Sequence, residues 1–174
     1  EGIGTTASGD GSHAEGDITT ASGDYSHAEG SSTEASGVGS HAEGIGTTAS
    51  GDGSHAEGSY TTATGNYSHA EGNYTTASGE ASHAVGDGTT ASGDYSHASG
   101  YNAVASDITA FAWQGSSGNF DEPQYNSHGP GTFNLNPVGG LAGFWIGETT
   151  LASLLNAKAT YLAATNIAAA AVAG

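Results

Sequence analysis

The sequence lacks cysteine and methionine, and it holds a single basic residue, Lys158, against 18 acidic residues. Without cysteine the chain has neither a disulfide framework nor thiolate metal ligands. The formal net charge of −17 argues against nucleic acid and anionic membrane surfaces as partners. No apolar run reaches the roughly 18 residues that a membrane-spanning helix needs, so we expect no direct membrane insertion.

Large apolar side chains are also absent from most of the chain. Residues 1–100 contain no leucine, phenylalanine or tryptophan. The first hundred residues therefore cannot bury the apolar area of an ordinary globular core. The chain begins within a repeat, at Glu1 and without a methionine, so we expect it to be a piece of a longer protein with targeting or anchoring segments elsewhere.

What the sequence does contain is one unit repeated in register. Every fourteenth residue is a histidine within SHAEG, SHAVG or SHASG: His13, His27, His41, His55, His69, His83 and His97. A second motif, TTASG or a close variant, lies between them and divides each unit into two halves of seven. Glycine recurs every seven residues from Gly2 to Gly100. Such a constant register is typical of a solenoid and not of disordered low-complexity sequence.

A seven-residue period also occurs in coiled coils, but here it predicts strands. A helix with glycine in every second turn loses about 1 kcal/mol at each glycine, and no apolar seam compensates. We therefore expect 14-residue coils of two short strands, with glycine allowing positive φ in the turns. Alternation places Ser12 and Ala14 inside, and His13 and Glu15 outside. Because an alanine and serine interior buries little apolar area, a lone roll should be marginally stable, and something is expected to cover one of its faces.

The alternation of G-x-x-S-x-A-x-G with G-x-x-T-x-A-x-G over residues 1–105 resembles the head repeats of trimeric autotransporter adhesins, the YadA-like head. The resemblance implies an all-β fold: a left-handed parallel β-roll solenoid, with three chains packed about a threefold axis. It also implies attachment to host cells, matrix or another surface, a location at the cell surface or outer membrane, no enzyme activity and no cofactor. Similar repeats occur in phage tail fibres, so a receptor-binding or spacer segment of a tail fibre is the alternative.

The family's strand is typically S-V-A-I-G, in which valine and isoleucine help to pack the rolls together. Here the matching positions hold histidine and glutamate, so the resemblance implies an interchain interface along them. Its candidate residues are the seven histidines together with Glu15, Glu29, Glu43, Glu57 and Glu71. Imidazole N–H groups would then donate to carboxylates or backbone carbonyls of a neighbouring chain.

Two other interpretations of the histidines remain. Three histidines at one level around an axis resemble a metal site, although we assign no metal to the ladder. A histidine–glutamate acid–base pair is disfavoured, because no nucleophile or substrate-positioning residue accompanies it. Stacked histidines repel one another when charged, so we expect thermal stability to change between about pH 7 and 5, with a sign that the sequence leaves open.

The turns and the second strand carry further candidates. Five tyrosines on turns are candidate contacts for a protein or glycan receptor: Tyr25, Tyr60, Tyr67, Tyr74 and Tyr95. The alternative is that each ring stacks on the adjacent coil. A threonine column runs from Thr6 to Thr90 and is interrupted by Glu34. Because regular hydroxyl ladders on flat β-solenoids resemble ice-binding surfaces, ice binding is an alternative function.

Three segments follow from these patterns: a β-roll over residues 1–105, an irregular aromatic transition over 106–148, and a helix over 149–174 that begins a coiled-coil stalk. Apolar residues of the transition are expected to cap the end of the roll: Phe111, Trp113, Phe133, Leu135, Phe144 and Trp145. A receptor-binding aromatic patch is the alternative. A threonine N-cap after Gly147, followed by good helix formers, favours the stalk.

Overall fold

The computed structural model describes residues 2–115, 125–126, 133–136, 145–146 and 149–150. The chain divides into two compact units, Glu1–Leu135 and Asn136–Gly174. The described part consists of strands and turns without any helix, which confirms the predicted all-β fold. Within the same residues there is accordingly no helix long and apolar enough to cross a membrane.

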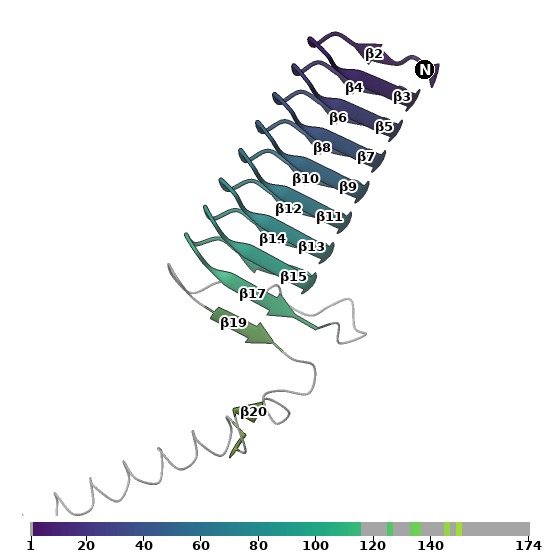
Figure 1. The fold of residues 1–174 in the computed structure, drawn as a ribbon. Helices are drawn as coiled ribbons and strands as arrows, with labels where there is room; N and C mark the ends of the chain where they lie inside the picture. The colour runs from purple at the N-terminus through teal and green to yellow at the C-terminus, as the bar shows by residue number, and fades with distance from the viewer. Residues whose placement is uncertain (1, 116–124, 127–132, 137–144, 147–148, 151–174) are drawn as a thin grey trace, which may run out of the picture. The chain divides into compact units, whose positions relative to one another are not determined.

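The first unit is a parallel solenoid in which each coil gives one strand to each of two sheets (Figure 1). We call them the histidine sheet and the threonine sheet. The histidine sheet contains, in order, β1 (Gly2–Ile3), β3 (His13–Asp17), β5 (His27–Ser31), β7 (His41–Ile45), β9 (His55–Ser59), β11 (His69–Asn73), β13 (His83–Asp87), β15 (His97–Tyr101), β17 (Phe111–Gln114) and β19 (Phe133–Asn136). The threonine sheet contains β2 (Thr6–Ala7), β4 (Thr20–Ala21), β6 (Glu34–Ala35), β8 (Thr48–Ala49), β10 (Thr62–Ala63), β12 (Thr76–Ala77), β14 (Thr90–Ala91), β16 (Ala103–Ala105) and β18 (Tyr125–Asn126).

The register of both sheets advances by one repeat per strand. His27 pairs with His13 on one side and with His41 on the other. In the threonine sheet, Thr62 lies between Thr48 and Thr76 in the same way. Equivalent residues of successive repeats therefore stack in columns, and the predicted coil of 14 residues is confirmed.

The interior of the roll is built from small side chains, except in the last described coil, where Gln114 is also buried. Alanine is the only hydrophobic residue type that is fully buried among the described residues, and it forms one column in each sheet, as at Ala56 and Ala63. Inward serines and threonines, such as Ser54 and Thr61, fill the rest and are equally buried. The alternation predicted from the sequence is therefore correct, with serine and alanine inside and histidine and glutamate outside.

Successive coils approach so closely that only glycine fits at one position in each half of the coil. A Cβ atom on Gly58 would lie 2.1 Å from the carbonyl oxygen of Gly72, and one on Gly51 would lie 2.1 Å from that of Gly65. Gly58 also has a φ of +117°, a conformation that other residues rarely adopt. The seven-residue glycine spacing is therefore a steric requirement of coil stacking.

The coil register continues past residue 105, where the sequence pattern placed its end. Strand β17 pairs with β15, and Phe111 continues the histidine column. Its neighbours Ala110 and Ala112 are buried like the inward residues of the other coils. The segment AFAWQ at 110–114 thus occupies the place of SHASG, with phenylalanine for histidine. Inward alanine, and not histidine, is the residue that marks this coil.

The second unit contains the antiparallel pair β20 (Trp145–Ile146) and β21 (Thr149–Thr150). The two threonines proposed to start the helix therefore lie in a strand. Residues 151–174 and Phe144 lie outside the described residues, so the helical stalk stays a prediction. The remaining cap candidates Phe133 and Leu135 belong to β19, and the described part gives their backbone position only.

Candidate functional site

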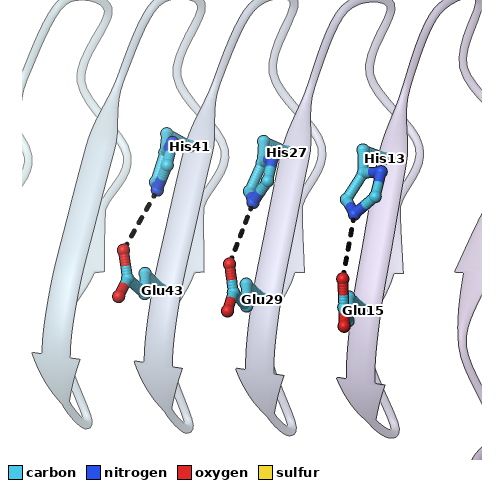
Figure 2. A network of polar contacts seen from close by, with 6 residues as sticks. All are labelled: His13, Glu15, His27, Glu29, His41 and Glu43. Carbon is cyan, nitrogen blue, oxygen red and sulfur yellow. Dashed lines mark ion pairs between the residues drawn. The ribbon is translucent and has the colours of Figure 1, made fainter. Parts of the chain in front are cut away.

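The outward side of the histidine sheet, which we call the histidine face, carries two parallel columns. One holds the histidines from His13 to His97, and the other holds the residues two positions further on, from Glu15 to Glu71. Residues two apart on a strand point to the same side of a sheet. Figure 2 shows this for three coils, where each imidazole points along its own strand toward the glutamate.

Neighbouring imidazoles stack at the spacing of the coils. The ring centroids of His27 and His41 are 4.8 Å apart with an interplanar angle of 10°. Near the C-terminal end of the roll the arrangement changes, and His83 meets His97 edge to face at 76°. The ring of Phe111 then lies parallel to His97, at 4.8 Å and 3°. The aromatic column is therefore continuous from His13 to Phe111.

Four histidines also lie within ion-pair distance of the glutamate of their own strand, and each contact becomes an ion pair when the imidazole is protonated. The distances between Nε2 and Oε2 are 3.5 Å for His13–Glu15 and 3.8 Å for His55–Glu57, with the two pairs between them at 3.5 and 3.6 Å. Exposed pairs with this geometry contribute at most about 1 kcal/mol each. The ion pairs therefore contribute little to the order of the imidazoles.

Burial in the stack affects the charge of three histidines. It lowers the pKa of His55, His83 and His97 below the ordinary histidine value and is the largest cause for each of them. Positive charge on the adjacent histidines lowers the pKa of His55 and His83 further, while nearby glutamates partly oppose the shift. These three imidazoles are therefore mainly neutral at pH 7.

The glutamate column does not reach the C-terminal end of the face. Val85 pairs with Glu71 on one side and with Ser99 on the other, and Trp113 follows Ser99. Trp113 keeps 37% of its surface exposed. The histidine face therefore changes from charged to apolar along the roll, a change that sequence reasoning missed. The residues of the glutamate column, read at 14-residue spacing, carry the signal.

One group of three or more potential metal ligands occurs among the described residues. The ligand atoms of His69, Glu71 and His83 lie within 4.8 Å of one another. The group offers two imidazoles and one carboxylate on adjacent coils, and no further histidine, aspartate or glutamate belongs to it among the described residues. Metal binding by the ladder therefore stays an alternative interpretation.

The turn tyrosines lie against the preceding coil and also remain accessible. The rings of Tyr60 and Tyr74 are stacked, with centroids 5.0 Å apart. The ring of Tyr25 lies over Gly11, where an added Cβ would meet its Cδ1 at 3.0 Å. All five are more than half exposed and have φ between 51° and 58°: Tyr25, Tyr60, Tyr67, Tyr74 and Tyr95. Receptor contact by these residues stays a prediction.

The turns are tied together by side chains to which the sequence pattern assigned no role. Asp24 accepts a hydrogen bond at Oδ1 from the N–H of Asp10, at 2.9 Å, and Asp52 accepts one from the N–H of Val38, at 3.0 Å. Asn66 and Asp94 make the same contact in their coils. The recurrence of Asp or Asn at 14-residue spacing is the signal that identifies this ladder.

The outward side of the threonine sheet presents a hydroxyl column. Thr48, Thr62 and Thr76 are aligned by the strand register and are half-buried. Glu34 separates Thr20 from Thr48, and Val104 takes the position after Thr90. The column is therefore interrupted on one side and ends at a valine on the other.

The coils from residue 42 onward are similar to a known family of repeats. The family model of the YadA head domain repeat (2 copies) matches residues 42–68, 70–96, 84–106 and 91–112. The match confirms the resemblance, and its last segment reaches into β17. None of the curated proteins matches the chain. YadA-family adhesins are surface-exposed trimeric autotransporters, and YadA-like heads form homotrimers in general.

Proposed function

We propose that this chain, whose residues 42–112 match the YadA head domain repeat, is the adhesive head of a homotrimeric fibre on a cell surface. In the proposed assembly three rolls stand side by side with their histidine faces toward the threefold axis. The remaining surface attaches the fibre to host cells, matrix or another surface. The observation that carries the proposal is the family match over a roll of registered 14-residue coils.

The packing of the single roll supports an assembly. Its buried hydrophobic residues are alanines, each of which contributes far less than the roughly 1.5–3 kcal/mol of a buried leucine or phenylalanine. Small scaffolds with such cores are usually stabilised by disulfides, metals or oligomerisation, and this chain contains no cysteine. Packing three histidine faces together would cover the imidazole column and the side chains of Phe111 and Trp113.

The same features support a structural, non-enzymatic role. The family is one of adhesins, and its fold is a solenoid of repeated coils. Each histidine–glutamate pair recurs on the next coil without a nucleophile or positioning residue of its own, whereas an active site is a single constellation.

Sedimentation of the full chain tests the assembly. At neutral pH we expect one species with three times the chain mass of 16.9 kDa. A folded monomer at micromolar concentration would contradict the proposed homotrimer.

Glycine substitutions on one edge of the roll test receptor attachment. Glycine occupies the position of Tyr67 in other coils, as at Gly39 and Gly53, so the roll accepts it there. We expect a chain with Tyr25, Tyr67 and Tyr95 changed to glycine to stay trimeric but to bind less to cells or matrix-coated surfaces than the wild type. A second variant with glycine at Tyr60 and Tyr74 tests the two candidates on the other turn edge. Equal binding by the wild type and both variants would exclude the turn tyrosines as receptor contacts.

The hydroxyl column supports ice binding as a second candidate function. Thr48, Thr62 and Thr76 lie in one regular column on a sheet face. Thermal hysteresis measured on the full chain separates the two candidates: an adhesive head gives none, and an ice-binding rod lowers the freezing point without changing the melting point.

A further inference from the structure

The histidine face consists of two parts with different chemistry. In the first five coils the position two residues after each histidine is a glutamate, from Glu15 to Glu71. In the last three coils the same position holds Val85, Ser99 and Trp113. The final coil also replaces histidine by Phe111, which stacks on His97. Along one continuous sheet face, a charged ladder is therefore followed by an apolar and neutral patch.

The patch has the features of a contact surface. Trp113 is 37% exposed on the outer side of a paired strand, where a large apolar side chain gains most from being covered. His83 and His97 have no glutamate two residues further on, and burial lowers their pKa values, so both are mainly neutral at pH 7. Covering the side chains of Val85, Phe111 and Trp113 therefore removes apolar surface from water, and the two neighbouring imidazoles add little charge to be desolvated.

The charged ladder has the opposite balance. Each copy of the chain brings five carboxylates to the face, and these are about half exposed where they pair with a histidine, as in Glu29 at 54%. Removing ionised carboxylates from water costs several kcal/mol per ion, and the accompanying neutral imidazoles return only part of this. When copies of the chain run parallel and in register, equivalent coils face one another. The glutamates of one chain then approach the glutamates of the next.

A second copy of this chain is the partner that fits both parts. In a parallel, in-register assembly the apolar end of one chain meets the apolar end of another, and each histidine column lies beside its equivalents. We propose that Val85, Phe111 and Trp113 form the anchor through which copies of this chain associate, and that the coils from Glu15 to Glu71 contribute little to the affinity. This inference rests on the proposed homotrimer and assigns its binding energy to one end.

The substitution Val85→Glu tests the anchor without risk to the fold. Five other coils hold glutamate at this position, so the roll accepts it. We expect the full chain carrying Val85→Glu to show a dissociation constant raised tenfold or more in sedimentation equilibrium at pH 7.4. The reverse exchange one coil away, Glu71→Val, is the matched control and should leave the dissociation constant unchanged or lower it. Trp113→Glu should weaken association at least as much as Val85→Glu.

The outcomes separate this inference from the proposal beneath it. A wild-type chain that sediments as a folded monomer overturns the homotrimer and the anchor together. A trimeric wild type whose dissociation constant is unchanged by Val85→Glu and by Trp113→Glu overturns the anchor alone. Weaker association of Glu71→Val would place the binding energy in the charged ladder and would also overturn it. Far-UV circular dichroism of each variant confirms that the roll is intact.

Discussion

At the scale of single residues, two kinds of glycine serve different purposes in the roll. One kind, exemplified by Gly58, lies where the next coil leaves no room for a Cβ atom. The other kind, exemplified by Gly39, lies in a left-handed turn with a φ of +62° and open space around it. Ala81 occupies the same turn position in another coil, with a φ of 49°. Conformation alone therefore restricts the second kind, whereas the backbone of the next coil and, at Gly58, a φ of +117° both restrict the first.

Alanine substitutions distinguish the two kinds. Gly58→Ala places Cβ 2.1 Å from the carbonyl oxygen of Gly72 in the neighbouring coil, so we expect a loss of about 3 kcal/mol or more in the free energy of unfolding. Gly39→Ala should cost only about 1 kcal/mol, from the left-handed conformation. Chemical denaturation of both variants measures the difference. Equal losses would mean that coil stacking does not limit Gly58.

The buried threonine hydroxyls suggest a second exchange. The Oγ1 atom of Thr61 is buried and has no hydrogen-bond partner within the described residues. Removing an unpaired buried hydroxyl while keeping the side-chain shape is neutral or favourable. Thr61→Val should therefore leave the free energy of unfolding unchanged or raise it by up to about 1 kcal/mol. Thermal denaturation measures this change.

A neighbouring serine provides the contrast. Ser68 donates a hydrogen bond from Oγ to the carbonyl oxygen of Gly65, at 2.7 Å. Ser68→Ala should therefore destabilise the roll by about 1 kcal/mol. If Thr61→Val were the more damaging exchange, the inward threonine would have a bonding role that the structure does not display.

At the scale of elements, the histidine column determines how the roll responds to acid. Burial lowers the pKa of His55, His83 and His97 in the folded state. The unfolded chain then binds more protons than the folded chain as the pH falls below about 6.5. The contribution of these three histidines to the free energy of unfolding is therefore fully present above that pH. It is lost as the pH falls toward their lowered pKa values in the folded state. The structure thus supplies the sign that the sequence left open.

The melting temperature should accordingly decrease between about pH 7.5 and pH 5.0. The lowered pKa values already include the effect of the neighbouring groups. Adjacent imidazoles favour the neutral form, and the nearby glutamates Glu43, Glu57 and Glu71 partly oppose it. Phenylalanine at positions 55, 83 and 97, the residue type that Phe111 already brings to this column, should reduce the decrease. A melting temperature that is constant or rises on acidification would contradict the role of the stack.

The strands also show which features a sequence of this kind can predict. Coil length and the inward or outward side of each residue follow from the seven-residue recurrence, since strand alternation leaves no other register with alanine inside. The last coil was harder to predict, because AFAWQ at 110–114 shares only its central alanine with SHAEG. The stacking of Phe111 on His97 needs coordinates, because ring orientation depends on packing that spacing does not encode.

At the scale of the whole molecule, the sequence predicts that the roll needs a partner better than it predicts the face on which that partner packs. A core of alanine, serine and threonine indicates that a face is covered, but two faces of the roll were available. Histidine and glutamate at the positions of valine and isoleucine favour the histidine face through the family resemblance. Val85 and Trp113 at one end of that face now add an observation from the chain itself.

The meeting of three chains on the histidine face is the central claim, and the absence of cysteine allows a direct test. One spin label can be placed at Ser99→Cys on the histidine face and, in a second protein, at the exposed Ser92→Cys beyond β14. Dipolar electron paramagnetic resonance then measures the distances between labels of different chains. We predict shorter interchain distances at position 99 than at position 92. Longer distances at 99 than at 92, or no interchain coupling at 99, would contradict the account.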